Sequence, residues 1–364
     1  MTDDLRSATG GSDARMTIAA EPWGEVDGQR VSLYTLTNTN GVVVRITNYG
    51  ATVVGLLVPD RNGTVGDVVL GLDTLDAYVR SPLYFGATVG RVGNRIADAR
   101  FELVGRMYTL AANHRPHHLH GGTRGWDKVV WSAEPIKGSY GPRLHLEAES
   151  PDGDEGYPGS VRATATYTLT NDDKLAVVMT ATTDRTTIVN MVHHSYFNLD
   201  VDPSSDIREH ELQLSAQSWT PGMPPDGRVI AVKSTPFDFT RPKAIGRDLA
   251  AAGSPGAGAP AGYDSNWIVD GLPGELREFA SLRDPRSGRV MTLWANQPGI
   301  QFYSGVFLDG TSQGKGRTHV LYSGVCLESQ AFPNAINVTE WRDQVILAPG
   351  QTYRHETIYG FSTD

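Results

Sequence analysis

Histidines gather in two short stretches of this chain of 364 residues, and they are the first feature that could carry chemistry. Six of the ten histidines lie in "NHRPHHLHGG" (113–122) and "NMVHHSYFNL" (190–199). Such clustering suggests either a metal site or a polar binding cleft. His118 and His120 would face the same way on a strand, a spacing that suits zinc, but no HExxH helix or cysteine pair supports a metal. For His114 and His117, an exposed loop position is an equal alternative.

His193 and His194 are adjacent in a stretch that is typical of a single β-strand. Successive side chains of a strand point to opposite faces, so at most one of the two faces a given site. Composition and periodicity do not decide which of them it is.

Two carboxylates have unusual neighbours. Glu328 lies in "GVCLESQAFPNAIN" (324–337), within an otherwise apolar strand, and Asp264 lies in "GYDSNW" (262–267). A carboxylate in an apolar strand is seldom fully buried unless it is paired or functional. Glu328 is therefore the best single candidate for a catalytic carboxylate, with a buried ion pair as the alternative. Cys326 would share its strand face, but no basic neighbour indicates a reactive thiolate, so core packing is the better interpretation.

The glycine-rich stretch "GATVGRVGNRI" (86–96) does not match a nucleotide-binding loop. Its glycines do not fit GxGxxG, and no amphipathic helix follows to present its N-terminus to a phosphate. What remains is Arg95, beside Asn94 in a glycine-bracketed turn. From this stretch alone, a surface salt bridge and a binding role for Arg95 both stay open.

The elements that must position these residues are short β-strands. Segments rich in Val, Ile, Thr and Tyr recur between turn residues, among them "RVSLYTLTN", "GVVVRITNYG" and "HVLYSGVCLE". This pattern predicts an all-β sandwich or barrel. In "LTNDDKLAVV", residues 171–173 are predicted to form the turn between two alternating strands. A short helix is predicted over 73–81, with Asp73 or Thr74 as its N-cap, and a parallel α/β sheet is disfavoured because it needs many more helices.

Composition argues against several classes of partner. The net charge of −9 comes from scattered acids, and no run of lysines or arginines forms a phosphate-binding stripe, so nucleic acid and membrane surfaces are not expected. The chain contains no signal-peptide core and no apolar stretch of the roughly 20 residues that span a bilayer. Its one cysteine excludes an intrachain disulfide. We therefore expect a cytoplasmic protein.

The domain organisation is expected to be simple. Residues 1–19 are polar and predicted to form a disordered extension, and residues 20–364 are predicted to form one β-sandwich domain. The Ala/Gly/Pro-rich segment 249–262 has the composition of a linker. We interpret it as a long surface loop instead, because strand-like segments of the same character resume directly after it.

Eight ordered blocks carry a resemblance that covers nearly the whole chain from about residue 20. They are "NYGATVVGLLVPDRNG", "GRVGNRI", "LHGGTRGWDKVVW", "HHSYFNL", "TPFDF", "GYDSNW", "PGIQFYSG" and "CLESQAFPNAIN". With these blocks in this order, the sequence resembles the aldose 1-epimerases, or galactose mutarotases. The resemblance implies an all-β fold, an antiparallel β-supersandwich of the galactose mutarotase type.

The resemblance also implies an activity and a set of site residues. The expected enzyme interconverts the α and β anomers of a free aldose such as galactose or glucose, with no cofactor and no metal. His194, directly before the Ser-Tyr-Phe-Asn-Leu run, would be the general acid, and Glu328 the general base. Acid catalysis needs His194 protonated while Glu328 is ionised, a state that their proximity would favour. The implied sugar-binding residues are Asn94, Arg95, His120, Asp264 and Gln301. Trp126 would either stack on the sugar or pack in the core.

Two positions depart from the family pattern, which often has Asn at the position of His193 and His at that of Ser265. These differences bear on sugar preference more than on reaction type. The alternatives are a hexose-6-phosphate 1-epimerase, which needs extra cations, a sugar-binding module without turnover and, more distantly, a glycosidase that uses Asp264 with Glu328. The expected partner is a small aldose, bound by a monomer or homodimer.

Overall fold

Antiparallel β-strands dominate the computed structural model, which describes residues 16–256 and 258–364. The all-β, antiparallel β-supersandwich expected from the sequence is confirmed. The first large sheet has the order β1 (Thr17–Val26), β2 (Gln29–Thr37), β3 (Val43–Thr47), β4 (Thr52–Pro59) and β5 (Val65–Asp67).

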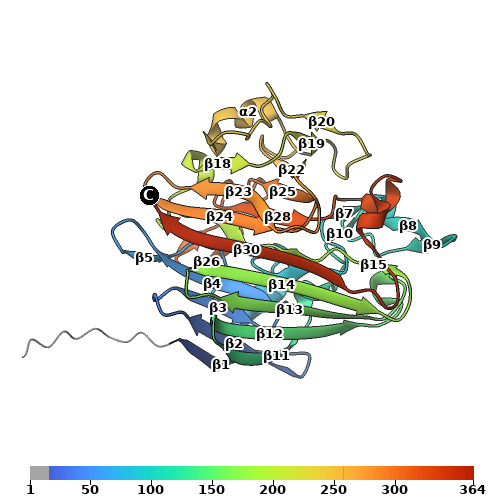
Figure 1. Ribbon diagram of the computed structural model, residues 1–364, viewed down its shortest axis with the longest axis horizontal. Helices are drawn as coiled ribbons and strands as arrows, with labels where there is room; N and C mark the ends of the chain where they lie inside the picture. The colour runs from blue at the N-terminus through green and yellow to red at the C-terminus, as the bar shows by residue number, and fades with distance from the viewer. Residues whose placement is uncertain (1–15, 257) are drawn as a thin grey trace, which may run out of the picture.

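The second sheet has nine strands and runs through the middle of the molecule. Its order is β11 (Ser132–Gly138), β12 (Gly141–Ser150), β13 (Val161–Leu169), β14 (Lys174–Thr183), β30 (Tyr353–Thr363), β24 (Arg289–Ala295), β23 (Arg277–Arg283), β18 (Glu211–Leu214) and β21 (Lys243–Ala244). Figure 1 shows its long strands lying side by side, with the C-terminal strand β30 in red between β14 and β24.

The third sheet has six strands and carries much of the site. Its order is β17 (Tyr196–Phe197), β28 (Val325–Gln330), β25 (Gly299–Tyr303), β22 (Asp264–Ile268), β19 (Ser218–Thr220) and β20 (Ile230–Ala231). One continuous core cluster contains residues from all three sheets, so their apolar faces pack on one another: Val44, Ile46, Leu146, Val177, Ile300 and Leu327 are examples.

Short elements connect these sheets. The two-stranded pairs are β6 (Thr88–Val89) with β16 (Val192–His193), β7 (Arg95–Ile96) with β10 (His118–Leu119), β8 (Arg100–Leu103) with β9 (Arg106–Thr109), β15 (Thr187–Ile188) with β29 (Ile346–Leu347), and β26 (Gln313–Gly314) with β27 (Arg317–Thr318). The α-helices in the described residues are α1 (Leu75–Arg80) and α2 (Leu249–Ala252). Single 3₁₀ turns cover Ala97–Ala99, Trp126–Lys128, Asp154–Gly156, Ile207–Glu209, Ile245–Asp248, Ala335–Asn337 and Arg342–Gln344.

Local predictions agree with these elements in most places. Strand β13 buries every second residue, as period-2 alternation requires, and residues 171–173 lie in the turn between β13 and β14. The predicted helix is α1, and the N-cap is Thr74, whose side chain accepts a hydrogen bond from the backbone of Ala77.

The predicted boundary between a disordered extension and the domain falls within a β-strand. Strand β1 begins at Thr17 and pairs with β2, so the last residues of the predicted extension 1–19 belong to a sheet, because their backbone groups are hydrogen-bonded there. Residues 1–15 lie outside the described residues. The segment 249–262, predicted to be a surface loop, begins instead with the helix α2 (Leu249–Ala252), and it precedes β22, whose sheet also contains β17 and β19 from before that segment.

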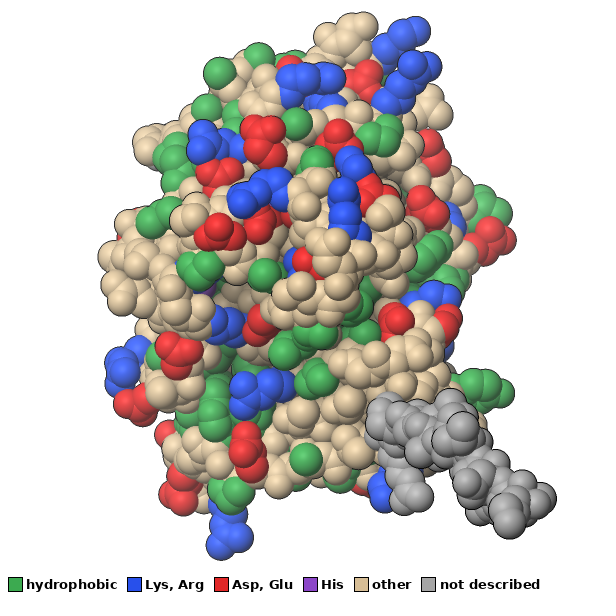
Figure 2. Space-filling model, turned by 90° about the vertical axis from the view of Figure 1, so that its left-hand side faces the viewer, with side chains coloured by type: hydrophobic (Ala, Val, Ile, Leu, Met, Phe, Trp, Pro, Cys, Tyr) green, Lys and Arg blue, Asp and Glu red, His purple; other side chains and the backbone are tan. Residues whose placement is uncertain are grey.

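The charged surface is mixed. Figure 2 shows basic and acidic side chains interspersed on one face of the molecule, without a large patch of either sign. Within the described ranges, no helix has the length and apolar character that crossing a bilayer requires.

Two histidines lie buried between the sheets, away from solvent. His193 is 3 % exposed and its Nε2 lies 2.8 Å from Oγ of Ser195, while His355 is fully buried with its Nδ1 donating to the carbonyl of Met191 at 2.9 Å. Burial lowers the pKa of His193 to about 3 and that of His355 to about 4. The folded protein therefore keeps both rings neutral at pH values where an unfolded chain protonates them.

We expect acid to destabilise the fold through these rings, and His193→Asn to reduce that effect. The pKa of His193 is lower in the folded than in the unfolded protein. The stability that the neutral ring contributes is therefore fully present above the unfolded pKa of about 6.5 and is lost as pH falls from there toward about 3. Between pH 7 and pH 5, urea unfolding should show that the wild type loses about 2 kcal/mol more than His193→Asn. Parallel pH dependences of the two proteins would contradict this prediction.

Candidate active site

The six-stranded sheet brings three polar side chains to one face through its register. In β28, Cys326, Glu328 and Gln330 share a face because strand side chains alternate. Glu328 pairs directly with Gln301 of β25. Two residues away on the same face, Cys326 pairs with Tyr303 of β25. Tyr303 in turn pairs with Asp264 of β22. Asp264, Gln301 and Glu328 are thus neighbours although they are up to 64 residues apart in sequence.

His194 reaches the same space from a break between two strands. The expected single strand over "NMVHHSYFNL" is wrong: β16 ends at His193 and pairs with β6, and β17 begins at Tyr196 and pairs with β28. The chain passes from one sheet to another here, so His194 lies in the connection, where its backbone N–H donates to the carbonyl of Ala87 at 2.9 Å. The two histidines still face opposite ways, His193 into the core and His194 into a cavity.

Asn94, Arg95 and His120 lie at the corner formed by β7 and β10. The backbone N–H of His120 donates to the carbonyl of Asn94 at 2.9 Å, and the N–H of Asn94 donates to Nδ1 of His120 at 3.1 Å. These reciprocal bonds hold both residues in the left-handed region, with φ of 59° for Asn94 and 49° for His120. His120 is therefore outside the strand β10, and its side chain turns into the cavity.

His118 does not join His120 in a metal-binding pair. Its Nδ1 donates to the carbonyl of Ala111 at 2.7 Å, and its Nε2 lies 2.6 Å from the hydroxyl of Tyr157. Both ring nitrogens are thus used in the core, so the expectation of a common strand face for the two histidines is wrong.

A cavity of about 200 Å³, partly open to solvent, collects these side chains. The lining residues are Pro82, Leu83, Tyr84, Asn94, Arg95, His114, Leu119, His120, His194, Tyr196, Asp264, Tyr303, Phe307 and Glu328. His114 belongs to an exposed loop and also borders the cavity. Trp126 is 2 % exposed and packs against Trp131, so it is a core residue and does not line the cavity.

Three tyrosines of the lining are missed by the sequence interpretation. Tyr196 and Tyr303 carried a usable signal, since each lies two residues after a candidate site residue. Tyr84 carried none, because it lies in a loop whose path only the packed structure defines. Its ring stacks on His194 with centroids 5.7 Å apart.

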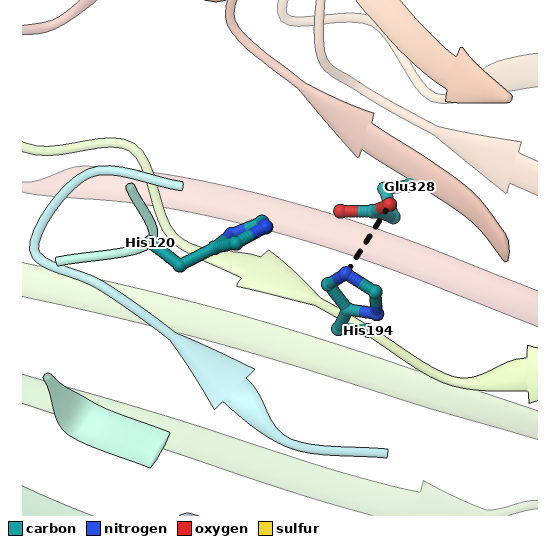
Figure 3. A group of neighbouring side chains, drawn as sticks. All are labelled: His120, His194 and Glu328. Atoms are coloured by element: carbon teal, nitrogen blue, oxygen red, sulfur yellow. Dashed lines mark ion pairs between the residues drawn. The ribbon is translucent and has the colours of Figure 1, made fainter. Parts of the chain in front are cut away.

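His194 and Glu328 form the chemical centre of the cavity (Figure 3). Nε2 of His194 lies 3.7 Å from Oε1 of Glu328, and Oε2 of Glu328 is buried without a hydrogen-bond partner. Burial lowers the pKa of His194 to about 4 and raises that of Glu328 well above its ordinary range, with the charge of Asp264 adding to the rise. Burial thus favours a neutral pair, in which Glu328 holds the proton, over the ion pair expected from proximity alone.

Asp264 is held between a cation and an amide. Nη2 of Arg95 lies 3.7 Å from Oδ2 of Asp264, and Nε2 of Gln301 donates to Oδ1 at 2.6 Å. Burial raises the pKa of Asp264, while Arg95 and this hydrogen bond oppose the rise. Gln301 is not among the lining residues, and it contacts the site through Asp264. Nε of Arg95 is buried without a partner, so a ligand could satisfy it.

The donor set of the cavity fits a hydroxyl ligand better than a metal ion. One ligand atom each from His120, His194 and Glu328 lies within 4.8 Å of the others, and Figure 3 shows the three side chains directed toward a common space. However, Nδ1 of His120 accepts from the N–H of Asn94, so the neutral ring carries its proton on Nε2. That nitrogen can donate to a hydroxyl oxygen but has no lone pair for a metal.

A second hollow, beside Asp200 and His210, is larger, but charged side chains of its lining are paired with one another. Asp200 pairs with Arg286 at 2.7 Å, and Asp206 pairs with Arg208 at 2.7 Å, so these charges already satisfy one another. The cavity around Glu328 is therefore the stronger candidate for an active site.

Comparison with known proteins gives one consistent result. The sequence profile of the aldose 1-epimerase family matches residues 32–360. The galactose mutarotase of Bos taurus is 40 % identical over 323 residues, which cover 88 % of this chain and 91 % of that protein. The aldose 1-epimerase of Escherichia coli is 34 % identical over 340 residues, covering 92 % of this chain and 96 % of that protein. The crystal structure of galactose 1-epimerase from Lactobacillus acidophilus superposes with a TM-score of 0.83 and 26 % identity, covering 96 % and 99 % of the two chains.

Replacing Glu328 by glutamine should stabilise the ligand-free protein increasingly as pH rises. Because the folded pKa of Glu328 is raised, wild-type stability falls as pH rises from about 4.3, the unfolded value, toward the folded pKa. Glutamine does not titrate, so the stability gained by Glu328→Gln should grow by up to about 1.4 kcal/mol for each pH unit. Thermal unfolding of both proteins at pH 5 and pH 8 measures this difference.

Glu340→Gln, which changes an exposed glutamate, is the matched control and should show no growing difference. A stability difference between Glu328→Gln and wild type that stays constant over pH would contradict the prediction.

Proposed function

This chain belongs to the aldose 1-epimerase family, and we propose that it interconverts the α and β anomers of a free hexose such as galactose or glucose. The observation that carries the proposal is the meeting of His194 and Glu328, 3.7 Å apart, in a cavity walled by hydrogen-bonding side chains. The names of the relatives, galactose mutarotase and aldose 1-epimerase, support the substrate class.

The proposed reaction opens and recloses the sugar ring. Glu328 takes the proton of the anomeric hydroxyl, His194 gives a proton to the ring oxygen, and the C1–O5 bond breaks to leave an aldehyde. Rotation about C1–C2 then presents the other face of the carbonyl, and the two residues exchange roles as the ring closes. Each positioned proton transfer is typically worth about 10²–10⁴-fold in rate.

The neutral pair of the ligand-free cavity holds the one proton that this cycle needs. Moving that proton from Glu328 to His194 gives the reactive imidazolium–carboxylate form with no exchange with solvent. Sugar hydroxyls that donate to Glu328, together with the nearby guanidinium of Arg95, would stabilise the ionised carboxylate and so favour this form.

The other proposed site residues orient the sugar. Asn94, Arg95, His120 and Asp264 would bind its hydroxyls, since each lines the cavity and has a polar side chain. Gln301 would act by orienting Asp264, given its 2.6 Å hydrogen bond to that carboxylate. The buried, unpartnered atoms Glu328 Oε2 and Arg95 Nε support these roles, because a bound hydroxyl would satisfy them.

We further propose that the region 20–364 acts as a single domain, as a monomer or homodimer, in cytoplasmic carbohydrate metabolism. The uninterrupted family match over 32–360 supports one domain, and all of the proposed catalytic groups come from one chain. The buried free thiol of Cys326 is compatible with a reducing compartment.

Polarimetry of a freshly dissolved pure anomer tests the proposed reaction. Wild-type protein should accelerate equilibration, and Glu328→Gln or His194→Asn should each lower kcat by about 10²–10⁴-fold, because each removes one positioned proton transfer. No acceleration by the wild type would exclude the proposed function.

His193→Asn is the matched control for His194→Asn. It alters the neighbouring histidine, which faces the core. It should leave kcat within about threefold of wild type, which is less than half of the roughly 1.4 kcal/mol that corresponds to a tenfold change. A large loss in His193→Asn together with a small loss in His194→Asn would reverse the proposed roles.

Phosphorylated sugars should be poor substrates. Among the described lining residues Arg95 is the one lysine or arginine, and it already faces Asp264. A phosphate dianion would therefore meet two carboxyl groups with little cationic compensation, and kcat/KM for a hexose 6-phosphate should be at least about tenfold below that of the free sugar. Equal or better turnover of the phosphate would favour the hexose-6-phosphate alternative.

A further inference from the structure

The imidazole of His194 has two tyrosines beside its ring and a neighbour at each nitrogen. Tyr84 stacks on the ring at a centroid distance of 5.7 Å and 29° between the planes, and Tyr196 lies at 5.2 Å and 32°. Nε2 faces Glu328, while Nδ1 contacts the sulfur of Cys326 at 3.6 Å. The buried Sγ is the one side-chain hydrogen-bonding partner of Nδ1 among the described residues, and the backbone of His194 itself is the other group that hydrogen-bonds to the ring.

The proposed acid step constrains which nitrogen keeps a proton. The imidazolium carries hydrogen on both nitrogens, and when Nε2 gives its proton to the ring oxygen, the remaining hydrogen must stay on Nδ1. The same tautomer is needed in the neutral pair, because Nε2 must offer its lone pair to the proton on Glu328. Nδ1–H therefore needs an acceptor in every state of the cycle.

We propose that Cys326 is the positioning residue for this acid: its sulfur accepts the Nδ1–H of His194 and so reserves Nε2 for the proton that moves. The proposal rests on the proposed function, in which His194 is the general acid. Its geometric basis is the pairing of Cys326 with Tyr196 across β28 and β17, which places the sulfur beside a residue two positions after His194.

A sulfur acceptor also has a chemical consequence for the strength of the acid. Thiol sulfur accepts hydrogen bonds weakly, whereas the structural histidines His118 and His355 donate Nδ1–H to backbone carbonyls at 2.7 and 2.9 Å. A charged acceptor such as a carboxylate would stabilise the imidazolium far more than a neutral thiol or hydroxyl does, and would make it a poorer donor to a weakly basic ring oxygen. Burial also raises the pKa of the Cys326 thiol, so it stays neutral and does not add a charge beside Glu328.

Three substitutions separate the acceptor from the volume of the side chain. Cys326→Ser keeps an acceptor, Cys326→Ala removes both acceptor and volume, and Cys326→Val fills the space without an acceptor. Polarimetric kcat should stay within about threefold of wild type for serine and fall by about tenfold for alanine and valine, a tenfold loss being 1.4 kcal/mol. KM should change less than twofold in all three, because the residue does not line the cavity.

Nitrogen-15 NMR of the histidine rings in the ligand-free protein gives a readout that does not depend on turnover. His194→Asn identifies the His194 signals by their loss. Wild type and Cys326→Ser should show His194 as the Nδ1–H tautomer, and Cys326→Ala and Cys326→Val should show a large fraction of Nε2–H.

The outcomes are distinct for the two proposals. An Nε2–H tautomer in the wild type, full kcat in the alanine and valine variants, or equal losses in serine and valine would each overturn the role of Cys326. If wild-type protein did not accelerate mutarotation, the proposed function would fail, while the wild-type tautomer would still report whether the sulfur accepts from Nδ1.

Discussion

The register of the six-stranded sheet is the constraint on which the site depends. Pairing of Glu328 with Gln301, and of Tyr303 with both Asp264 and Cys326, puts the polar residues of three strands on one face. Side chains alternate with a period of two, so a slip of one residue between strands would turn one member of each pair into the core. The opposite faces of these strands carry residues such as Leu327 and Ile300, which are buried in the shared core, and their burial resists such a slip.

The cavity keeps polar groups in a state that is unfavourable without a ligand. Glu328 Oε2 and Arg95 Nε are buried and unpartnered, and His194 is held neutral by burial. Such groups destabilise a fold by about 1–3 kcal/mol each, which a large surrounding core can offset. The same burial reverses the ordinary order of the two proton affinities, because it raises the pKa of the Glu328 carboxyl and lowers that of the His194 imidazole, so the pair of the ligand-free cavity keeps its proton on Glu328.

Much of the fold could be predicted because its signals are local. Alternation in β13 and β14, the turn at 171–173 and the Thr74 cap each depend on residues a few positions apart. The break at His194 could not be read in this way. The stretch 190–199 has the pattern of one strand, and it becomes two because β16 and β17 pair with different partners, β6 and β28, that are distant in sequence.

The sequence by itself determined the type of fold, the family and the candidate site residues, because strand alternation and ordered motifs are present along the chain. Only the tertiary structure decided how these residues are placed relative to one another. It separated His118 from His120, put Gln301 behind Asp264, added Tyr84 to the cavity and set Cys326 against Nδ1 of His194. In the tertiary structure, burial favours a neutral pair of His194 and Glu328 over the ion pair that was expected from proximity. The physical reason is that proton affinity and hydrogen-bond partners depend on burial and on neighbours from other strands, which no local pattern specifies.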